Sequence, residues 1–375
     1  MAKPQEDRMK RREFLKKAGV VAASGAFSPL MFARAQASTF RLEMVSSFPA
    51  SLDIIYGGGE EIARVLDELT GGDVQITVYP AGAQVGGFEV YDAVSSGAFA
   101  LGHSAAYYYV GRNPAHAFFT AVPFGLTAQQ HNAWLMAGGA QELWNELNAQ
   151  DNLIAFAAGN TGTQMGGWFR REINTPQDLR GLTMRIPGFG GEVMTRAGAN
   201  VQNLPGGEIF LALDTGVIDA TEWVGPYDDE ILGLNQAAPF YYGPGWQEPS
   251  ATLCLYVNLD TYNAFPPEIQ EAFRTAAHAA NELMLARYEA ENGPALQRLV
   301  DSGTQLRTFS PEILTALRGH MDEVHDQNAS GNEFYARTLE SFTAFRDNIR
   351  EWHRQAEYAF QNFIYDQSAQ EEAGG

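Results

Sequence analysis

Cysteine is almost absent from the chain: Cys254 is the only one among 375 residues. An internal disulfide is therefore impossible. Cys254 lies in the apolar run 251–257, where a thiol usually packs as a small hydrophobic group, so we expect it to be buried and unreactive. Histidine-rich clusters and the CxxC, HExxH and Gly-x-Ser-x-Gly motifs are also missing. These absences argue against zinc sites, redox thiols and the common hydrolase nucleophiles.

Lysine is the second scarce residue, because every lysine lies within residues 1–37. The whole chain carries a formal charge of −20, and residues 1–37 hold eight basic and three acidic side chains, so residues 38–375 carry about −25. Such a surface repels nucleic acid and anionic lipid, and we expect neither as a partner.

Long hydrophobic runs are also scarce. The apolar stretch 18–32 is broken by glycine, serine and proline, and it is too short to span a bilayer as a permanent helix. It follows a basic segment with the pair Arg11-Arg12 and precedes the small-x-small sequence 35–37. This order predicts a twin-arginine export signal over residues 1–37 and a periplasmic location. An uncleaved membrane anchor is the alternative.

Strand-like and helix-like segments alternate over the first two-thirds of the chain. The expected strands are 40–45, 74–79, 153–157, 182–186 and 218–223, and the expected helices include 53–69 and 128–148. This rhythm predicts an α/β fold with mostly parallel sheets covered by helices. A chain of this length normally forms about two domains.

The last third of the chain is expected to be helical. Pro266-Pro267 opens a helical pattern that extends to about residue 302, and Ser310-Pro311 is typical of a helix start. In a final long helix, 333–365, apolar residues recur mostly every three or four positions. This stripe either packs on the protein's own domain or forms a dimerisation arm exchanged between subunits.

Three stretches between residues 160 and 250 carry the densest polar and aromatic chemistry. Residues 160–168 read NTGTQMGGW, residues 174–188 read NTPQDLRGLTMRIPG, and residues 203–223 read NLPGGEIFLALDTGVIDATEW. Together they resemble the signature of the DctP-type solute-binding proteins of TRAP (tripartite ATP-independent periplasmic) transporters. The resemblance covers nearly all of the chain after residue 37. Glu222-Trp223 and the segment 245–248 (GWQE) are similar to the α-keto acid-binding subgroup, which carries a metal site at these positions.

The resemblance implies a two-lobed periplasmic binding protein fold of type II-like organisation. Residues 38–160 would form lobe I, completed by about 250–300, and residues 161–250 would form lobe II, completed by the C-terminal helices. Crossing strands near 158–165 and 248–256 would form the hinge. Such a protein is not an enzyme: it closes over a small organic carboxylate and delivers it to a membrane permease.

Arg185 is the first candidate binding residue, because it ends an apolar strand just before Pro187 and Gly188. A guanidinium can hold a carboxylate through two parallel hydrogen bonds. A structural ion pair with a nearby acidic residue is the alternative that the residues alone leave open. The resemblance favours the ligand, since TRAP binding proteins hold the substrate carboxylate with an arginine in this motif.

Gln164, Glu222 and Glu248 are oxygen donors expected at three separate strand ends, and the backbone carbonyl of Trp223 could be a fourth. Such a set suits a hard cation, whereas zinc and copper prefer histidine or cysteine. The resemblance implies that these four residues bind a sodium or calcium ion together with the substrate carboxylate, and that Gln164, Trp223 and Glu248 also contact the substrate. Without it, Glu222 and Glu248 could be ordinary surface carboxylates. The formal charges of the two glutamates, Arg185 and a substrate carboxylate do not distinguish sodium from calcium.

At least one tyrosine of the run 107–109 is expected to contact the substrate, and Tyr108 is the candidate. If this run is extended, strand alternation places Tyr107 and Tyr109 on one face and Tyr108 on the other.

Two other functions compete with that of a TRAP binding protein. An exported hydrolase could use Glu222 and Glu248 as an acid–base pair, and an ATP-driven transporter could use a binding protein of the same two-lobed plan. Among substrates, a short 2-oxo acid such as pyruvate or 2-oxobutyrate is favoured, and a 2-hydroxy acid such as lactate comes next.

Overall fold

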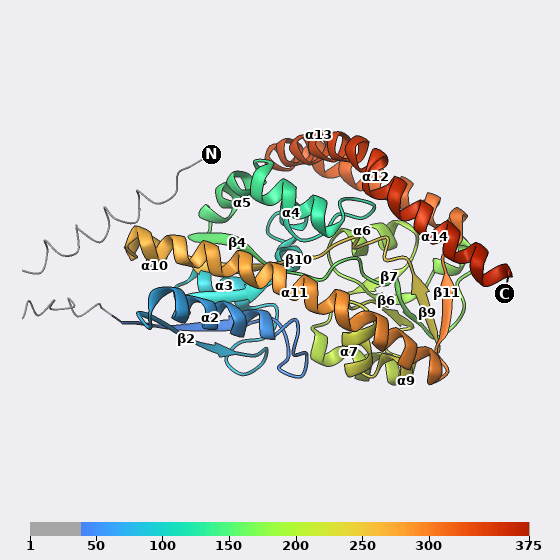
Figure 1. The fold of residues 1–375 in the computed structure, drawn as a ribbon, viewed down its shortest axis with the longest axis horizontal. Coiled ribbons are helices and arrows are strands. Elements are labelled where there is room, and N and C mark those ends of the chain that lie inside the picture. Colours follow the sequence, from blue (N-terminus) through green and yellow to red (C-terminus); the bar gives the residue numbers. More distant parts are fainter. Residues whose placement is uncertain (1–38, 375) are drawn as a thin grey trace, which may run out of the picture. The chain divides into compact units, whose positions relative to one another are not determined.

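The structure is a computed structural model that describes residues 39–374. The expected export signal, residues 1–37, lies outside the described residues. Within residues 39–374, two sheets are surrounded by helices (Figure 1), which confirms the expected α/β class. None of the described helices combines the length and the apolar character that crossing a bilayer requires.

The first sheet has five strands in the order β2-β1-β3-β10-β4. They are β1 (Phe40–Ser46), β2 (Val74–Tyr79), β3 (Leu101–Ser104), β4 (Leu153–Asn160) and β10 (Thr252–Asn258). The short helices near this sheet are α2 (Gly57–Thr70), α3 (Val90–Ser95), η1 (Ala106–Tyr109), η2 (Pro114–Phe119), α4 (Ala128–Ala137), α5 (Ala140–Ala149) and α10 (Leu259–Ala264). Cys254 in β10 is buried, as expected, and burial raises the pKa of its thiol to about 12.

The second sheet has six strands in the order β11-β9-β5-β8-β6-β7. They are β5 (Gly167–Phe169), β6 (Thr183–Arg185), β7 (Asn200–Gln202), β8 (Ala220–Thr221), β9 (Phe240–Gly243) and β11 (Gln305–Thr308). The helices between them are η3 (Pro176–Leu179), α6 (Gly188–Arg196), α7 (Gly206–Asp214), α8 (Pro226–Ile231) and α9 (Leu234–Ala237).

Both sheets are mixed, because β10 and β5 are each antiparallel to both of their neighbours. The remaining pairings are parallel. The chain enters β5 directly from the end of β4 and enters β10 from the second sheet after β9. A strand reached without a helical crossover on its own sheet can run against its neighbours, whereas parallel pairs need such a crossover.

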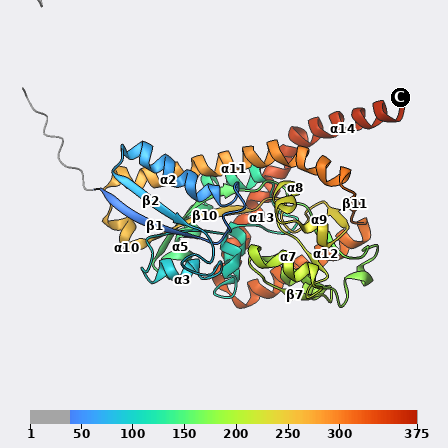
Figure 2. The same ribbon diagram turned by 90° about the horizontal axis from the view of Figure 1, so that it is seen from below.

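Helix α11 (Pro267–Asp301) is the longest helix and contacts elements of both sheets. It packs on α2 and β4 at one end and on α8 further along. Figures 1 and 2 show it running past both groups of elements. The helices after it are α12 (Pro311–Gly331), α13 (Glu333–Gln355) and α14 (Glu357–Gly374). The expected start at Ser310 is confirmed, since its hydroxyl accepts a hydrogen bond from the Ile313 amide at 3.3 Å.

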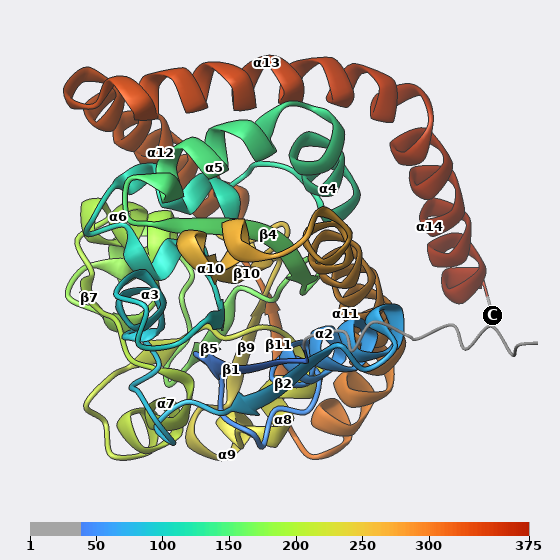
Figure 3. The same ribbon diagram turned by 90° about the vertical axis from the view of Figure 1, so that its left-hand side faces the viewer.

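The expectation of one continuous helix is wrong for both 128–148 and 333–365, because a break divides each of them into two helices. Gly139, in the left-handed region at φ 85°, separates α4 from α5. Ala356, at φ −107° and ψ −92°, separates α13 from α14. Figure 3 shows α13 running over α5 and α4, and α14 turning away from them.

The apolar stripe of the C-terminal helices divides at this second break. Phe342 of α13 is only 1% exposed and its ring lies 5.6 Å from that of Phe118 and 5.1 Å from that of Trp134. Trp352, near the end of α13, is 64% exposed. The large aromatic side chains of α14 are exposed as well: Tyr358, Phe360, Phe363 and Tyr365. The first part of the stripe therefore packs on the protein's own fold, and the second part does not.

Replacing Phe342 with alanine should lower the free energy of unfolding by about 3–5 kcal/mol, because it removes a buried ring and leaves a cavity beside Phe118 and Trp134. Trp352→Ala on the same helix is the matched control and should change stability by no more than about 0.5 kcal/mol. Chemical denaturation of both variants measures the difference. Equal effects would show that α13 does not pack as described.

Candidate functional site

The expected site residues come from three strand ends and one crossing segment, and the structure brings them together. Gln164 follows β4, Arg185 ends β6, Glu222 follows β8, and Glu248 precedes β10. The backbone N–H of Gln164 donates to the backbone carbonyl of Glu248 at 3.1 Å. Nη1 of Arg185 lies 2.5 Å from Oε1 of Glu222. Side chains far apart in sequence therefore meet where the chain passes between the two sheets.

Arg185 is buried, with only 1% of its side chain exposed, and so is its partner Glu222 at 0%. Its Nη1 also donates to the Glu222 carbonyl at 3.2 Å, and its Nε donates to the Leu204 carbonyl at 3.0 Å. Its Nη2 makes no hydrogen bond of normal geometry to any described residue. The structural ion pair that the sequence left open is thus present, and Nη2 is the one guanidinium nitrogen that it and the Leu204 carbonyl leave without such a partner.

Three buried oxygens nearby share this lack of partners. Oε1 of Gln164, Oε2 of Glu222 and Oε2 of Glu248 accept no hydrogen bond within the part of the chain that the structure describes. A buried polar atom without a partner costs about 1–3 kcal/mol, so four of them around one point need an explanation. Oxygen donors of this kind fit a hard cation, and Nη2 of Arg185 is a charged donor that fits a carboxylate oxygen.

The donor set also excludes a soft-metal site here. Among residues 39–374 there is no group of three or more histidine, cysteine, aspartate or glutamate side chains that could hold a metal. The cluster contains only two carboxylates, Glu222 and Glu248, and completes its oxygen set with the amide of Gln164. This composition agrees with sodium or calcium better than with zinc or copper.

Burial governs the charge state of the two glutamates. The pKa of Glu222 is raised to about 7: burial is the main cause, Arg185 opposes the shift, and the charge of Asp229 contributes to it. Burial likewise raises the pKa of Glu248 well above its ordinary value, and the charge of Glu222 adds to this effect. Arg185, Tyr107 and Gln164 oppose the shift at Glu248. Two buried carboxylates and one guanidinium leave an excess of negative charge that a cation would neutralise.

Trp223 covers the cluster from one side. Its ring lies 5.2 Å from Cζ of Arg185, a distance at which a guanidinium is attracted to an aromatic face. Gly206 allows the ring to approach closely, since a Cβ at that position would lie 2.5 Å from Cη2 of Trp223. The side chain of the expected metal ligand Trp223 is therefore part of the site; the role of its carbonyl stays a prediction.

A small cavity adjoins Gln164 and Trp223. It holds ≈ 10 Å³, about the volume that one water molecule needs. Its walls are mostly apolar or aromatic and come from elements of both sheets: Phe48, Ile55, Tyr107, Tyr108, Val224 and Leu253. A group bound here would meet polar atoms on one side and hydrocarbon on the other.

The expected alternation of Tyr107, Tyr108 and Tyr109 is wrong, because these residues form the 3₁₀ helix η1 and not a strand. Tyr107 lies beside Glu248 and Tyr108 beside Arg185. Tyr109 lies apart from them, with its hydroxyl 2.8 Å from Oγ of Ser104. Tyr108 therefore reaches the cluster as expected, and Tyr107 joins it.

Thr161 is a further site residue that sequence reasoning missed. Its hydroxyl accepts a hydrogen bond from Nε2 of Gln164 at 3.1 Å, which turns Oε1 of Gln164 away from Thr161. Its position in the polar stretch 160–168 was the only signal that could have identified it.

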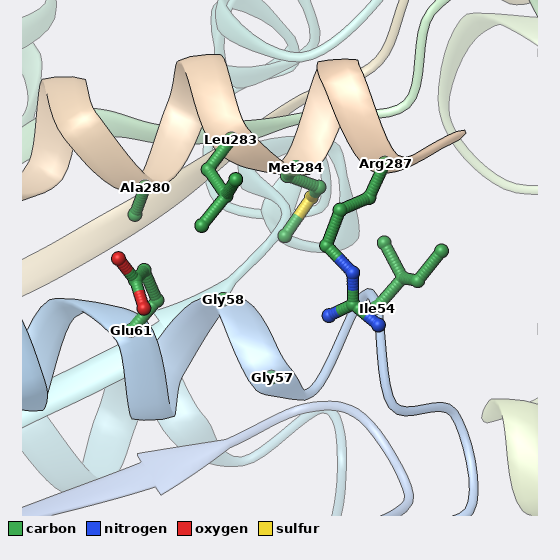
Figure 4. A pocket seen from close by; sticks show the side chains of 8 residues that line it. All are labelled: Ile54, Gly57, Gly58, Glu61, Ala280, Leu283, Met284 and Arg287. Carbon is green, nitrogen blue, oxygen red and sulfur yellow. The ribbon is translucent and has the colours of Figure 1, made fainter. Parts of the chain in front are cut away.

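A second cavity, between α2 and α11, holds none of these residues (Figure 4). It also measures ≈ 10 Å³. Met284 and Gly58 pack across it: a Cβ on Gly58 would lie 2.4 Å from Cε of Met284. This cavity is a packing gap between two helices and lacks the converging polar atoms of the cluster.

Comparisons with known proteins show which family the chain resembles. The family described as bacterial extracellular solute-binding protein, family 7, matches residues 45–332. A monocarboxylate 2-oxoacid-binding periplasmic protein of Nostoc sp. is 48% identical over 95% of this chain and 99% of its own length.

Two solved structures are similar throughout. A TRAP solute-binding protein of Bordetella bronchiseptica, a mixed-occupancy dimer with calcium and picolinate, has a TM-score of 0.87 and 39% identity over 89% of this chain and 99% of its own. One from Pseudoalteromonas atlantica, with sodium and pyruvate, has a TM-score of 0.84 and 36% identity over 87% of this chain and 99% of its own.

The free energy of unfolding of the ligand-free, metal-free protein should fall as the pH rises from about 7 to 8. Below about pH 6.5 the histidines His103, His116, His131 and His325, whose pKa values burial lowers, contribute the opposite slope. The folded state retains protons on Glu222 and Glu248 that the unfolded chain releases near pH 4.5, so stability is lost until the pH passes the folded-state pKa values. Glu248→Gln should flatten this fall and raise stability at pH 8. Part of the pH dependence of stability should remain in the Glu248→Gln variant, because burial also raises the pKa values of Asp228 and Asp229.

Denaturation curves at several pH values test this prediction. Glu271→Gln, on the exposed face of α11, is the matched control and should keep the wild-type profile. A Glu248→Gln profile as steep as that of the control would contradict the assignment of buried, raised-pKa carboxyls.

Proposed function

The chain belongs to family 7 of the bacterial extracellular solute-binding proteins, and we propose that it captures a short 2-oxo monocarboxylate, such as pyruvate, together with a sodium or calcium ion for a TRAP permease. The observation that carries the proposal is the convergence of four buried polar atoms without partners among the described residues: Gln164 Oε1, Arg185 Nη2, Glu222 Oε2 and Glu248 Oε2. The proteins of this family are receptors of transporters and not enzymes, so an acid–base role of Glu222 and Glu248 in hydrolysis is not retained.

Nη2 of Arg185 would hold the substrate carboxylate, since it is the guanidinium nitrogen that the fold leaves available. Gln164, Glu222, Glu248 and the carbonyl of Trp223 would hold the cation. The cation would supply the positive charge that two glutamates and a substrate carboxylate need beyond Arg185. With sodium the sum of these charges is about −1 and with calcium about 0, so either ion is compatible with the cluster.

The size and character of the cavity favour a short substrate. Its apolar walls suit a methyl or ethyl group, and Tyr107 and Tyr108 lie next to the polar cluster. The Nostoc relative binds 2-oxo monocarboxylates, and the Pseudoalteromonas structure holds pyruvate with sodium. A 2-oxo acid is therefore preferred over a 2-hydroxy acid such as lactate.

Capture would work by closure of two lobes. We assign residues 38–160 with about 250–300 to lobe I and residues 161–250 with the C-terminal helices to lobe II, of which α13 also packs on η2, α4 and α5 of lobe I. The membership of β10 in the first sheet and of β11 in the second supports this assignment. A ligand that contacts both lobes favours the closed state by its differential affinity.

Export would use the twin-arginine signal expected in residues 1–37, with cleavage after Ala37. Family membership agrees with a location outside the cytoplasm, and Arg11-Arg12 supports this export route.

We further propose a homodimer in which α14 of one subunit packs on the other. Its aromatic side chains are exposed, and a groove of ≈ 510 Å³ lies between α14, α4 and α11. Large aromatic side chains exposed along one helix are typical of an interface. The Bordetella structure is a dimer.

Pyruvate should raise the melting temperature of the protein in sodium or calcium buffer and should not do so after chelation in a buffer free of both ions. A ligand that binds only the folded state stabilises it in proportion to the logarithm of its concentration over Kd. Arg185→Lys keeps the charge but loses the planar fork, so its Kd should be at least about tenfold higher, equivalent to about 1.4 kcal/mol. Thermal shift and calorimetric titration measure both effects.

Arg307→Lys, in an exposed pair with Glu172, is the matched control and should bind as the wild type does. If no short carboxylate shifts the melting temperature in any buffer, the proposed function is wrong.

Ending the chain after Gln355 should convert a dimer into a monomer, because it removes α14 and its exposed aromatic residues. A chain that ends after Asp366 keeps these residues and should remain dimeric. Light scattering after size exclusion gives the mass of each. A monomeric full-length protein, or a dimer that persists without α14, would refute the proposed dimerisation through α14.

A further inference from the structure

The buried carboxyl of Asp228 lies beside the indole N–H of Trp223. Its Oδ2 accepts a hydrogen bond from Nε1 of Trp223 at 3.3 Å and another from the hydroxyl of Tyr288 at 2.8 Å. Asp228, Trp223 and Tyr288 are all buried. One oxygen atom thus joins a wall of the candidate site to helix α11, from which Tyr288 comes.

Asp229, the next residue, has a different set of partners. Its carboxyl accepts hydrogen bonds from Nε1 of Trp168 at 2.9 Å, from the hydroxyl of Tyr241 at 2.7 Å and from the Val224 amide at 3.2 Å. Trp168 and Tyr241 lie on β5 and β9 of the second sheet. Asp229 therefore fastens α8 to its own sheet, whereas Asp228 connects α8 to the site and to α11.

Trp223 in turn acts on Arg185. Its ring faces the guanidinium at 5.2 Å, and Gly206 closes off its far edge. The orientation of a buried tryptophan ring is set by its packing and by the partner of its N–H. The hydrogen bond to Asp228 fixes it, because the indole N–H is the only polar group of that side chain.

We propose that Asp228 is a positioning residue for ligand binding: through Trp223 it orients the Arg185 guanidinium, and through Tyr288 it ties that orientation to α11. The inference rests on the proposed function, because it assigns the consequence of this arrangement to carboxylate binding. Asp228 itself touches neither the substrate nor the cation. Helix α11 packs on elements of both sheets, so the orientation of Trp223 depends on how the two sheets are held.

A double-mutant cycle in the full chain tests this inference with pyruvate in sodium buffer as the probe. Asp228→Asn should raise the pyruvate Kd at least fivefold in the wild-type background. In a Trp223→Phe background, where the indole N–H is gone, the same substitution should change Kd less than twofold. A residue with a merely structural role would give the same change in both backgrounds.

Two tyrosine variants provide a matched comparison. Tyr288→Phe removes the hydrogen bond to Asp228 and should raise the pyruvate Kd about threefold or more. Tyr241→Phe removes the equivalent hydrogen bond to Asp229 from an equally buried position and should leave Kd within twofold while lowering the melting temperature of the ligand-free protein. This pair also keeps the test decisive if Asp228→Asn fails to fold.

The outcomes separate the two proposals. If the wild-type protein binds no pyruvate, the proposed function fails and this inference fails with it. If the wild type binds but Tyr288→Phe and Asp228→Asn bind equally well, or if the cycle is additive, only the positioning role of Asp228 is overturned.

Discussion

The buried ion pair between Arg185 and Glu222 is the interaction on which the site depends. Removing a guanidinium and a carboxylate from water costs several kcal/mol for each ion, and their attraction compensates only if the remaining donors and acceptors are also satisfied. Here they are not, because Nη2 of Arg185 and Oε2 of Glu222 have no partners among residues 39–374. Glu248 adds a second carboxyl to the same buried volume. The arrangement is therefore incomplete as a structural pair, and in the proposed function a carboxylate and a cation would complete it.

The fold supports this arrangement by attaching it to rigid elements. Arg185 and Glu222 lie at the ends of the paired strands β6 and β8, and the Glu222 amide donates to the Arg185 carbonyl at 3.3 Å. The short helix α8 then fixes the segment after Glu222. Four consecutive residues of α8, 227–230, each form a hydrogen bond through their side chains, with partners in the first sheet's loops, the site, the second sheet and α11.

Much of the site could be predicted from the sequence, since Arg185 and Glu222 lie in stretches whose strand-like pattern is local. The alternation of 182–186 and 218–223 identified β6 and β8, although the observed strands are shorter than expected. The face of Tyr107 could not be predicted in this way, because η1 replaces the strand directly after Ser104. A 3₁₀ turn has three residues per turn, and this removes the two-residue alternation on which the expectation depended.

The hydrogen bonds of Asp228 and the helix break at Ala356 could not be predicted from the sequence, for a different reason. Tyr288 is 60 residues away from Asp228 in the sequence, and no local pattern marks two residues that meet only through packing. Ala356 is a good helix former, so its sequence neighbourhood predicts a continuous helix. Of the two helices on either side of this break, α13 packs on the rest of the fold through Tyr335, Thr338 and Phe342, whereas the large aromatic side chains of α14 are exposed. Tertiary contacts therefore decide where the packed helix ends.

The size of the cavity bears on how a ligand reaches this site. It has room for about one water molecule, and pyruvate has six non-hydrogen atoms. Phe48 and Ile55 follow strand β1 of the first sheet, whereas Trp223 and Val224 follow strand β8 of the second. Walls that belong to both sheets can separate only if the sheets move relative to each other. In the proposed function binding would therefore be linked to that motion, and the charge of the carboxylate and the cation would provide the differential free energy that favours the closed arrangement.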